Sequence, residues 1–195
     1  TQSRSSAASD VYKRQLLREC LRGTTPPLVV LPANPVEAQR LHHHFVGKPA
    51  PGSALIMTTS GTTGTPKGAR LSAATLRASI DSTHTALGGP GRWLLAVPAH
   101  HIIGMQVLLR SLHTGYPPVT MPIDDGFQLA ALPDAITELL EGHHTQPQPQ
   151  SQPQTQSQPQ RRHYASLVPN QLDTLYQDLH LSLIHISEPT RPERI

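Results

Sequence analysis

The sequence predicts an α/β fold in which a mostly parallel sheet is flanked by helices. Two observations lead to this prediction. Short apolar runs of strand length recur along the chain, and helical patterns separate them. One such run leads directly into a loop rich in glycine and hydroxyl residues. Alternating strands and helices form layered sheets, and ligands bind at the carboxyl ends of the strands of such sheets.

The composition bounds the folded part of the chain. The 195 residues are enough for one domain with a core, but only 36% are hydrophobic and 4% aromatic, and there are 20 prolines. Four of these prolines fall in one tract at 146–160, where glutamine occupies every second position. Because this tract has no apolar residue to bury, we expect a disordered surface insertion there.

The charge and the cysteine content exclude several classes of protein. Most of the net charge of +3 lies in residues 1–15, and no basic stripe with interleaved aromatic residues occurs, so nucleic acid is not an expected partner. The single cysteine, Cys20, excludes an internal disulfide and fits a reducing compartment. No apolar run has the length of a membrane span or a signal segment. We therefore expect a cytoplasmic protein with no membrane partner.

The sequences of the two ends of the chain suggest that these segments do not come from the gene itself. Residues 5–15 and 181–191 look like in-frame translations of the transposase adaptors used to prepare sequencing libraries. We therefore expect residues 1–15 to be adaptor-derived or disordered, residues 181–195 to be adaptor-derived, and a partial domain to occupy 16–180.

The first half of this domain begins with a strand at 28–31. Asn34 and Pro35 then start a helix that runs to about residue 45, because asparagine caps the free N–H groups and proline suits the first helical position. A second strand is expected at 54–57. Ser72 caps the helix that follows it, which ends at the glycines of 88–91.

The second half continues the alternation. The apolar runs predict strands at 93–97, 119–121 and 164–168. The helical patterns predict helices at 103–112, 128–140, with Pro133 kinking it or starting a second helix, and 169–179, with Leu172, Leu175, Tyr176 and Leu179 on one side.

The loop at 58–68 has the chemistry of a phosphate-binding loop. Glycines allow backbone N–H groups to approach phosphate oxygens, hydroxyls add donors, and a lysine offsets the charge. Its candidate ligand-binding residues are Thr59, Ser60, Gly61, Thr62, Thr63, Gly64, Lys67 and Gly68. The spacing is not that of a Walker loop, since Pro66 stands where that pattern has glycine. The alternative is a flexible loop with no ligand.

This loop, read as Thr-Ser-Gly-Thr-Thr-Gly-x-Pro-Lys-Gly, resembles the signature of the adenylate-forming enzymes, which include acyl-CoA synthetases, peptide-synthetase adenylation domains and luciferases. The resemblance implies that the loop binds the phosphates of ATP and that Lys67 is catalytic. It also implies Mg²⁺ beside the phosphates, coenzyme A as co-substrate and a small carboxylic acid as substrate. The expected fold is then a partial N-terminal domain of such an enzyme.

A second segment, 98–104, resembles the family's Pro-x-x-His-x-x-Gly element, which lines the acyl pocket. The resemblance implies that His100 and His101 bind the acid and that His101 also has a catalytic role. The segment 165–172 resembles the family's next strand and loop, which implies that Ser166 and Pro169 line the same pocket. The sequence of residues 93–111 is similar to that of o-succinylbenzoate–CoA ligases, which act in menaquinone biosynthesis.

Other interpretations stay open. The acid is o-succinylbenzoate or another fatty, aryl or amino acid, or the chain is a non-catalytic interaction fragment that acts through its glutamine tract. The family's adenine, ribose and C-terminal lysine segments do not occur before position 180, so we expect this chain alone to be inactive and to bind ATP weakly. Consecutive histidines at 42–44 cannot share an ion on a helix, and no residue is assigned as a metal ligand. Oligomeric state is left open.

Overall fold

The structure is a computed structural model that describes residues 2–48, 50–59, 67–123, 126–141 and 162–177. Its α-helices are α1 (Gln2–Arg22), α2 (Pro35–Phe45), α3 (Ala73–Ala86), α4 (Ile102–Thr114), α5 (Leu132–Glu141) and α6 (Pro169–Gln177), with a short 3₁₀ turn, η1 (Leu129–Ala131). Its strands are β1 (Leu28–Val30), β2 (Leu55–Thr59), β3 (Lys67–Leu71), β4 (Gly91–Leu95), β5 (Val119–Thr120) and β6 (Arg162–Ser166). The glutamine tract at 146–160 lies outside the described residues.

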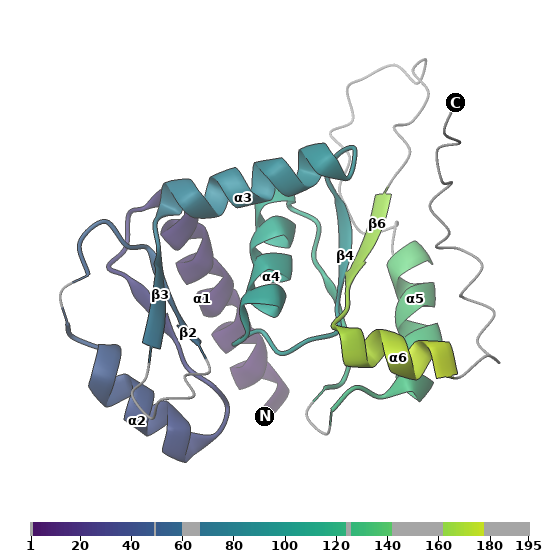
Figure 1. Cartoon of the computed structure of the whole chain (residues 1–195), viewed down its shortest axis with the longest axis horizontal. Coiled ribbons are helices and arrows are strands. Elements are labelled where there is room, and N and C mark those ends of the chain that lie inside the picture. Colours follow the sequence, from purple (N-terminus) through teal and green to yellow (C-terminus); the bar gives the residue numbers. More distant parts are fainter. Residues whose placement is uncertain (1, 49, 60–66, 124–125, 142–161, 178–195) are drawn as a thin grey trace.

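The strands form two sheets, of order β1-β2-β3 and β5-β4-β6 (Figure 1). In the first sheet, β1 and β2 are parallel and β2 and β3 antiparallel. In the second sheet, both pairings of β4 are parallel. The α/β prediction is confirmed. Of the five strands that were expected, β1, β4, β5 and β6 pair only in parallel, and β2 has one parallel and one antiparallel neighbour. The antiparallel strand β3 and the division into two sheets were not predicted.

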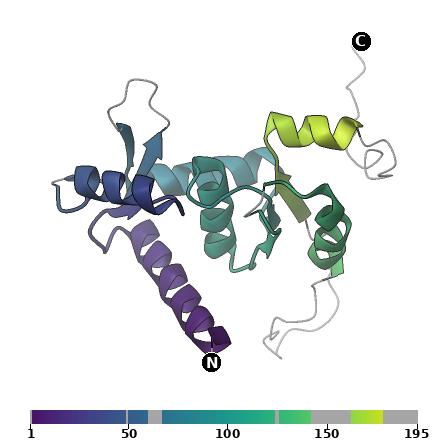
Figure 2. The same ribbon diagram turned by 90° about the horizontal axis from the view of Figure 1, so that it is seen from below.

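Helix α4 lies between the two sheets and joins their cores (Figure 2). Met105 and Leu109 of α4 pack with Met57 of β2 in the first core, while Val107 packs with Trp93 of β4 in another. The helix predicted at 103–112 is thus present and largely buried, because apolar residues occur nearly all round it. The two sheets are thus held in one body through a shared helix.

Helix α1 was not predicted. It covers most of residues 1–15, for which an adaptor-derived or disordered segment was expected, and the adaptor origin itself stays a prediction. Its last turns belong to the first core, where Leu17, Cys20 and Leu21 pack against β2 and α3. Cys20 is fully buried and its Sγ donates to the carbonyl oxygen of Ala54 at 3.2 Å. Burial raises the pKa of the Cys20 thiol to about 11, so this cysteine is a packed, unreactive thiol.

The predicted helix caps are present. The Asn34 side chain accepts hydrogen bonds from the N–H groups of Val36 and Glu37, at 3.0 Å each. The Ser72 hydroxyl accepts from the N–H of Thr75 at 3.0 Å. These local bonds fix where α2 and α3 begin, and only the cap residue Ser72 separates α3 from β3.

The structure decides two predictions near the C-terminal end. Of the two alternatives for Pro133, the second is confirmed: a 3₁₀ turn comes first, and Pro133 lies at the second position of a separate helix, α5, rather than kinking one helix over 128–140. Of the apolar side expected for α6, Leu175 packs against the core of the second sheet, whereas Leu172 and Tyr176 are 51% and 73% exposed and Leu179 lies outside the described residues. The buried residue of α6 is Gln171, whose polar side chain is satisfied by backbone groups.

His84 makes the stability of this fold depend on pH. It is buried on α3, near His113 and Arg110 of α4, with Asp81 of its own helix as the nearby carboxylate. Burial, then the positive charges of His113 and Arg110, lower its pKa, and Asp81 opposes this. His84 therefore binds a proton more readily in the unfolded chain than in the folded one, and the free energy of unfolding falls as the pH drops below about 6.5.

We expect the urea midpoint of this chain to fall between about pH 7.5 and about pH 5.5, and to fall less in a His84→Gln variant. His42→Gln, at an exposed position on α2, is the matched control and should keep the wild-type dependence. Equal pH dependence in wild type and His84→Gln would contradict the assignment.

Candidate functional site

The ends of the phosphate-loop candidate are described, and its centre is not. Residues 60–66 lie outside the described residues. Five of the predicted site residues are among them: Ser60, Gly61, Thr62, Thr63 and Gly64. On either side, β2 and β3 form an antiparallel hairpin in which Thr59 pairs with Lys67 and Thr58 with Gly68. Seven residues of the sequence, 60–66, therefore separate two strand ends that lie directly opposite each other.

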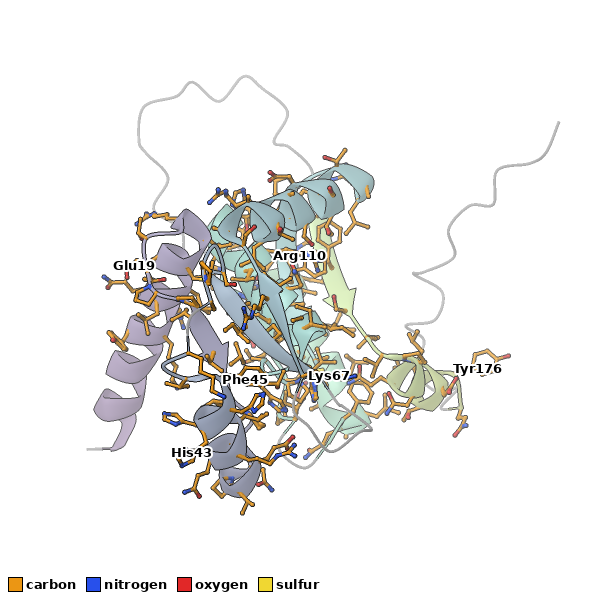
Figure 3. The ribbon with its side chains drawn as sticks, turned by 60° about the vertical axis from the view of Figure 1, so that its left-hand side comes forward. Glu19, His43, Phe45, Lys67, Arg110 and Tyr176 are labelled. Carbon is orange, nitrogen blue, oxygen red and sulfur yellow. The ribbon has the colours of Figure 1, made fainter. Side chains whose placement is uncertain are left out.

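The pairing also decides the direction of Lys67. Directly opposite residues of an antiparallel pair share a face, and side chains alternate along each strand. Lys67 therefore projects on the face that carries Leu55 and Met57, which faces the first core and α4. Lys67 is exposed and lies at the lower end of the hairpin (Figure 3).

Gly68 is required by packing on the other face of the hairpin. A Cβ atom at Gly68 would lie 2.7 and 2.9 Å from two ring carbons of Phe45, the last residue of α2, and 3.0 Å from Ile56. The ring thus sits directly on the backbone beside Lys67. Sequence analysis assigned Gly68 to phosphate binding; the structure adds a packing reason for glycine at this position.

The second segment follows β4 and leads into α4. His101 is the N-cap residue of α4, with φ −88° and ψ 149°, and its side chain makes no capping bond within the described structure. The rings of His100 and His101 lie 4.3 Å apart between centroids, tilted by 41°. Two imidazoles therefore stand together at the amino end of a 13-residue helix, where the helix dipole favours a carboxylate.

The two histidines differ in surroundings. His100 is half-buried and His101 exposed. Burial first, and then the neighbouring His101, lower the pKa of His100, while Glu37 at the start of α2 acts in the opposite direction. His100 is therefore held neutral and can offer one N–H and one ring nitrogen. Glu37 was not predicted as a neighbour of this segment, because only the tertiary fold brings α2 to it.

Gly104 explains the spacing of this segment. A Cβ at Gly104 would lie 2.4 Å from the carbonyl oxygen of Pro98 and 2.8 Å from that of Val97. The loop also closes through the N–H of His101, which donates to the Pro98 carbonyl at 3.0 Å. The loop after β4 therefore lies against bare helix backbone, and this contact turns the histidines toward the amino end of α4.

The third segment follows β6. Ser166 is the last residue of β6 and Pro169 the first of α6. Ser166 pairs with Leu95, the last residue of β4, so the segments after these two parallel strands leave the sheet side by side. Figure 1 shows both strand ends at the lower edge of the sheet, where α6 begins and the chain turns toward α4.

The structure therefore brings some predicted site residues together and leaves others undecided. His100 and His101 lie in the segment between β4 and α4, and Ser166 and Pro169 lie where β6 leads into α6, so these two segments follow neighbouring parallel strands. Lys67 and Gly68 belong to the first sheet, at the base of the hairpin loop. Sequence analysis missed Gln171, which bonds to the backbone after both β4 and β6; a glutamine three residues after a helix cap was the available signal.

The fit of cofactors can be judged from the donor set. An exposed lysine beside a glycine- and hydroxyl-rich loop suits a polyphosphate. No group of three histidine, cysteine, aspartate or glutamate residues that could hold a metal occurs in the part of the chain that the structure describes, including 42–44 on α2. No helix among the described residues is long and apolar enough to cross a bilayer.

Comparison with known proteins identifies the class. The family model described as "AMP-binding enzyme" matches residues 8–145, which is more than half of the chain. The chain therefore belongs to the family of AMP-binding enzymes.

Within this family, the chain is 45% identical over 132 residues to the "Probable 2-succinylbenzoate--CoA ligase" of Mycobacterium tuberculosis. The match covers 65% of this chain and 33% of that relative, so the chain spans about a third of the length of this relative. It is also 41% identical over 69 residues to the 2-succinylbenzoate–CoA ligase of Bacillus velezensis, covering 34% of this chain and 14% of that protein.

Solved structures that resemble the chain include o-succinylbenzoate coenzyme A synthetase (MenE) from Bacillus subtilis in complex with AMP. The identity is 32%, the match covers 45% of this chain and 18% of that one, and the TM-score is 0.40. The same enzyme in complex with the acyl-adenylate intermediate OSB-AMP matches at 21% identity over 85% of this chain and 42% of that one, with a TM-score of 0.49. The family assignment rests on the family model and on the sequence identity.

Proposed function

We propose that the complete protein that carries this chain is an ATP-dependent acid–CoA ligase, with o-succinylbenzoate as its acid. The observation that carries the proposal is the hydroxyl- and glycine-rich loop that ends in Lys67, located inside a region that matches the AMP-binding family. The identity of 45% to a 2-succinylbenzoate–CoA ligase supports the choice of acid. ATP, Mg²⁺ and coenzyme A are the implied cofactor and co-substrates.

The proposed chemistry has two steps. The carboxylate of the acid attacks the α-phosphorus of ATP, which forms the acyl-adenylate and releases pyrophosphate. The coenzyme A thiol then attacks the acyl carbon and AMP leaves. The first step exchanges a poor leaving group for a good one, so that the thioester can form from a carboxylate.

Each predicted residue has a role in this proposal. The loop from Thr59 to Gly64, with Gly68, holds the β- and γ-phosphates by its N–H and hydroxyl groups. Lys67 offsets the charge of the phosphates as pyrophosphate departs. The exposed imidazole of His101 at the amino end of α4 orients the acid carboxylate for attack, and the neutral His100 donates a hydrogen bond beside it. Ser166 and Pro169 line the acyl pocket. With one buried cysteine, the protein suits a reducing compartment, the cytoplasm.

The test is an assay of the complete gene product with a panel of acids. We expect formation of o-succinylbenzoyl-CoA, with AMP and pyrophosphate as the other products, only when ATP, Mg²⁺ and coenzyme A are all present. A fatty, aryl or amino acid that reacts with a higher kcat/KM would replace o-succinylbenzoate as the substrate. A complete protein that forms no thioester and no acyl-adenylate from any acid would overturn the proposal.

A further inference from the structure

The buried amide of Gln171 joins the two strand ends that carry the predicted acid-binding residues. Gln171 lies in the first turn of α6 and only 6% of it is exposed. Its Oε1 accepts a hydrogen bond from the N–H of Val168 at 3.0 Å. Its Nε2 donates to the carbonyl oxygen of Ala96 at 2.7 Å. Both ends of the amide are therefore engaged with backbone, on two different segments.

These bonds begin where the backbone ladder stops. The described pairing of β4 with β6 ends at Leu95 and Ser166. Ala96 follows β4 directly, and Val168 follows β6 by two residues. The Gln171 amide therefore adds one side-chain rung beyond the last backbone rung. Only a group that both donates and accepts can bridge a carbonyl oxygen and an N–H, which ionised carboxylates and ammonium groups cannot do.

Helix capping accounts for only half of this arrangement. The N–H of Gln171 donates to the Val168 carbonyl at 2.9 Å while its side chain returns to the Val168 N–H, as in the reciprocal bonds of a capping box. The bond to Ala96 crosses 75 positions of sequence and satisfies no helix end. It connects α6 to the start of the segment that carries His100 and His101.

We propose that Gln171 is a positioning residue for the acid substrate. It holds the segment after β4 and the segment after β6 at a fixed separation, so that the two histidines and Ser166 present one pocket. It does this through backbone and does not contact the acid. This role rests on the proposed ligase function. The nucleotide loop belongs to the other sheet and is attached to β2 and β3, so the role concerns the acid and not ATP.

The first test is a Gln171→Met variant of the complete protein, which keeps the side-chain volume and removes both hydrogen bonds. We expect the KM for the acid to rise about tenfold, with the KM for ATP within about twofold of wild type. The reason is that the Val168 N–H and the Ala96 carbonyl would lose their partner, which loosens only the segments after β6 and β4. Gln177→Met, the same change at an exposed position on α6, is the matched control and should leave both constants unchanged.

The second test is Gln171→Glu, measured across pH. A protonated carboxyl accepts from Val168 and donates to Ala96, whereas the ionised form has no proton to donate and repels the Ala96 oxygen. Relative to wild type at each pH, the acid KM of this variant should fall several-fold from about pH 8 to about pH 6, because burial raises the pKa of a carboxyl. A merely space-filling role would give no such pH profile.

The outcomes separate the two proposals. A complete wild-type protein that forms no thioester overturns the ligase function and the positioning role with it. An active wild type, with acid KM values for Gln171→Met within about twofold of wild type and no pH response of Gln171→Glu, overturns the positioning role alone. Should Gln171→Met fail to fold, the pH response of Gln171→Glu decides.

Discussion

Replacing Lys67 by methionine in the complete protein is expected to lower the rate of acyl-adenylate formation by about 10²–10³. Methionine has a similar length but no charge, so the variant removes a cation at the point where negative charge grows on the departing pyrophosphate. Because the backbone at position 67 is paired with Thr59, the strand cannot shift to bring another cation into the position of the Lys67 ammonium group. The effect should appear in kcat rather than in the KM for the acid.

The measurement is ATP–pyrophosphate exchange driven by the acid. Arg70→Met is the matched control, because Arg70 is an exposed cation on the same strand but on the opposite face of the hairpin. It should keep exchange within about twofold of wild type. Lys67→Arg should fall between the two, since the charge is kept but the compact ammonium geometry is lost. Unchanged exchange in Lys67→Met would remove the proposed role of the loop lysine.

Gly104→Ala is expected to destabilise the folded chain by about 2–3 kcal/mol. The new Cβ would lie 2.4 Å from the Pro98 carbonyl oxygen, and the atom it meets is backbone, not the movable end of a side chain. Helix propensity argues for the opposite sign, because alanine is favoured over glycine inside a helix by about 1 kcal/mol. The steric effect is larger, so we expect a net loss of stability.

Urea unfolding of the chain, followed by circular dichroism, gives this free energy directly. Ile103→Ala is the control, since Ile103 precedes Gly104 in the same turn and is 40% exposed. That change should cost well under the loss at Gly104. An increase of the urea midpoint in Gly104→Ala would show that the loop after β4 does not press on α4.

The parts of the fold that sequence reasoning predicted are those with local causes. The helix that starts at Pro35 was predicted because Asn34 and a proline at the first position are sufficient signals. The helix after Ser72 followed from the same logic. A loop at 58–68 was expected from residue chemistry alone; the structure has Thr58 and Thr59 at the end of β2 and Lys67 and Gly68 at the start of β3.

The features that were missed depend on distant contacts. Strand β3 reads Lys-Gly-Ala-Arg-Leu, with no β-branched or aromatic residue, and exists through its pairing with β2. Leu172 and Tyr176 suggested the buried side of α6, but tertiary bonds bury Gln171 instead. In the candidate site, the placement of the segments after β4 and β6 on neighbouring strands depends on the order of strands in the second sheet, which periodicity does not contain.

The ladder between β2 and β3 imposes a parity rule on the lysine. Because side chains alternate along a strand, Lys67 shares a face with Ala69 and Leu71, which stand two and four positions further along β3, and the present register places that face on the side of the apolar core. A shift of the pairing by one position would carry its ammonium group to the side occupied by the Phe45 ring. Length changes within the loop leave this parity untouched, whereas a single residue gained or lost in the stem reverses it.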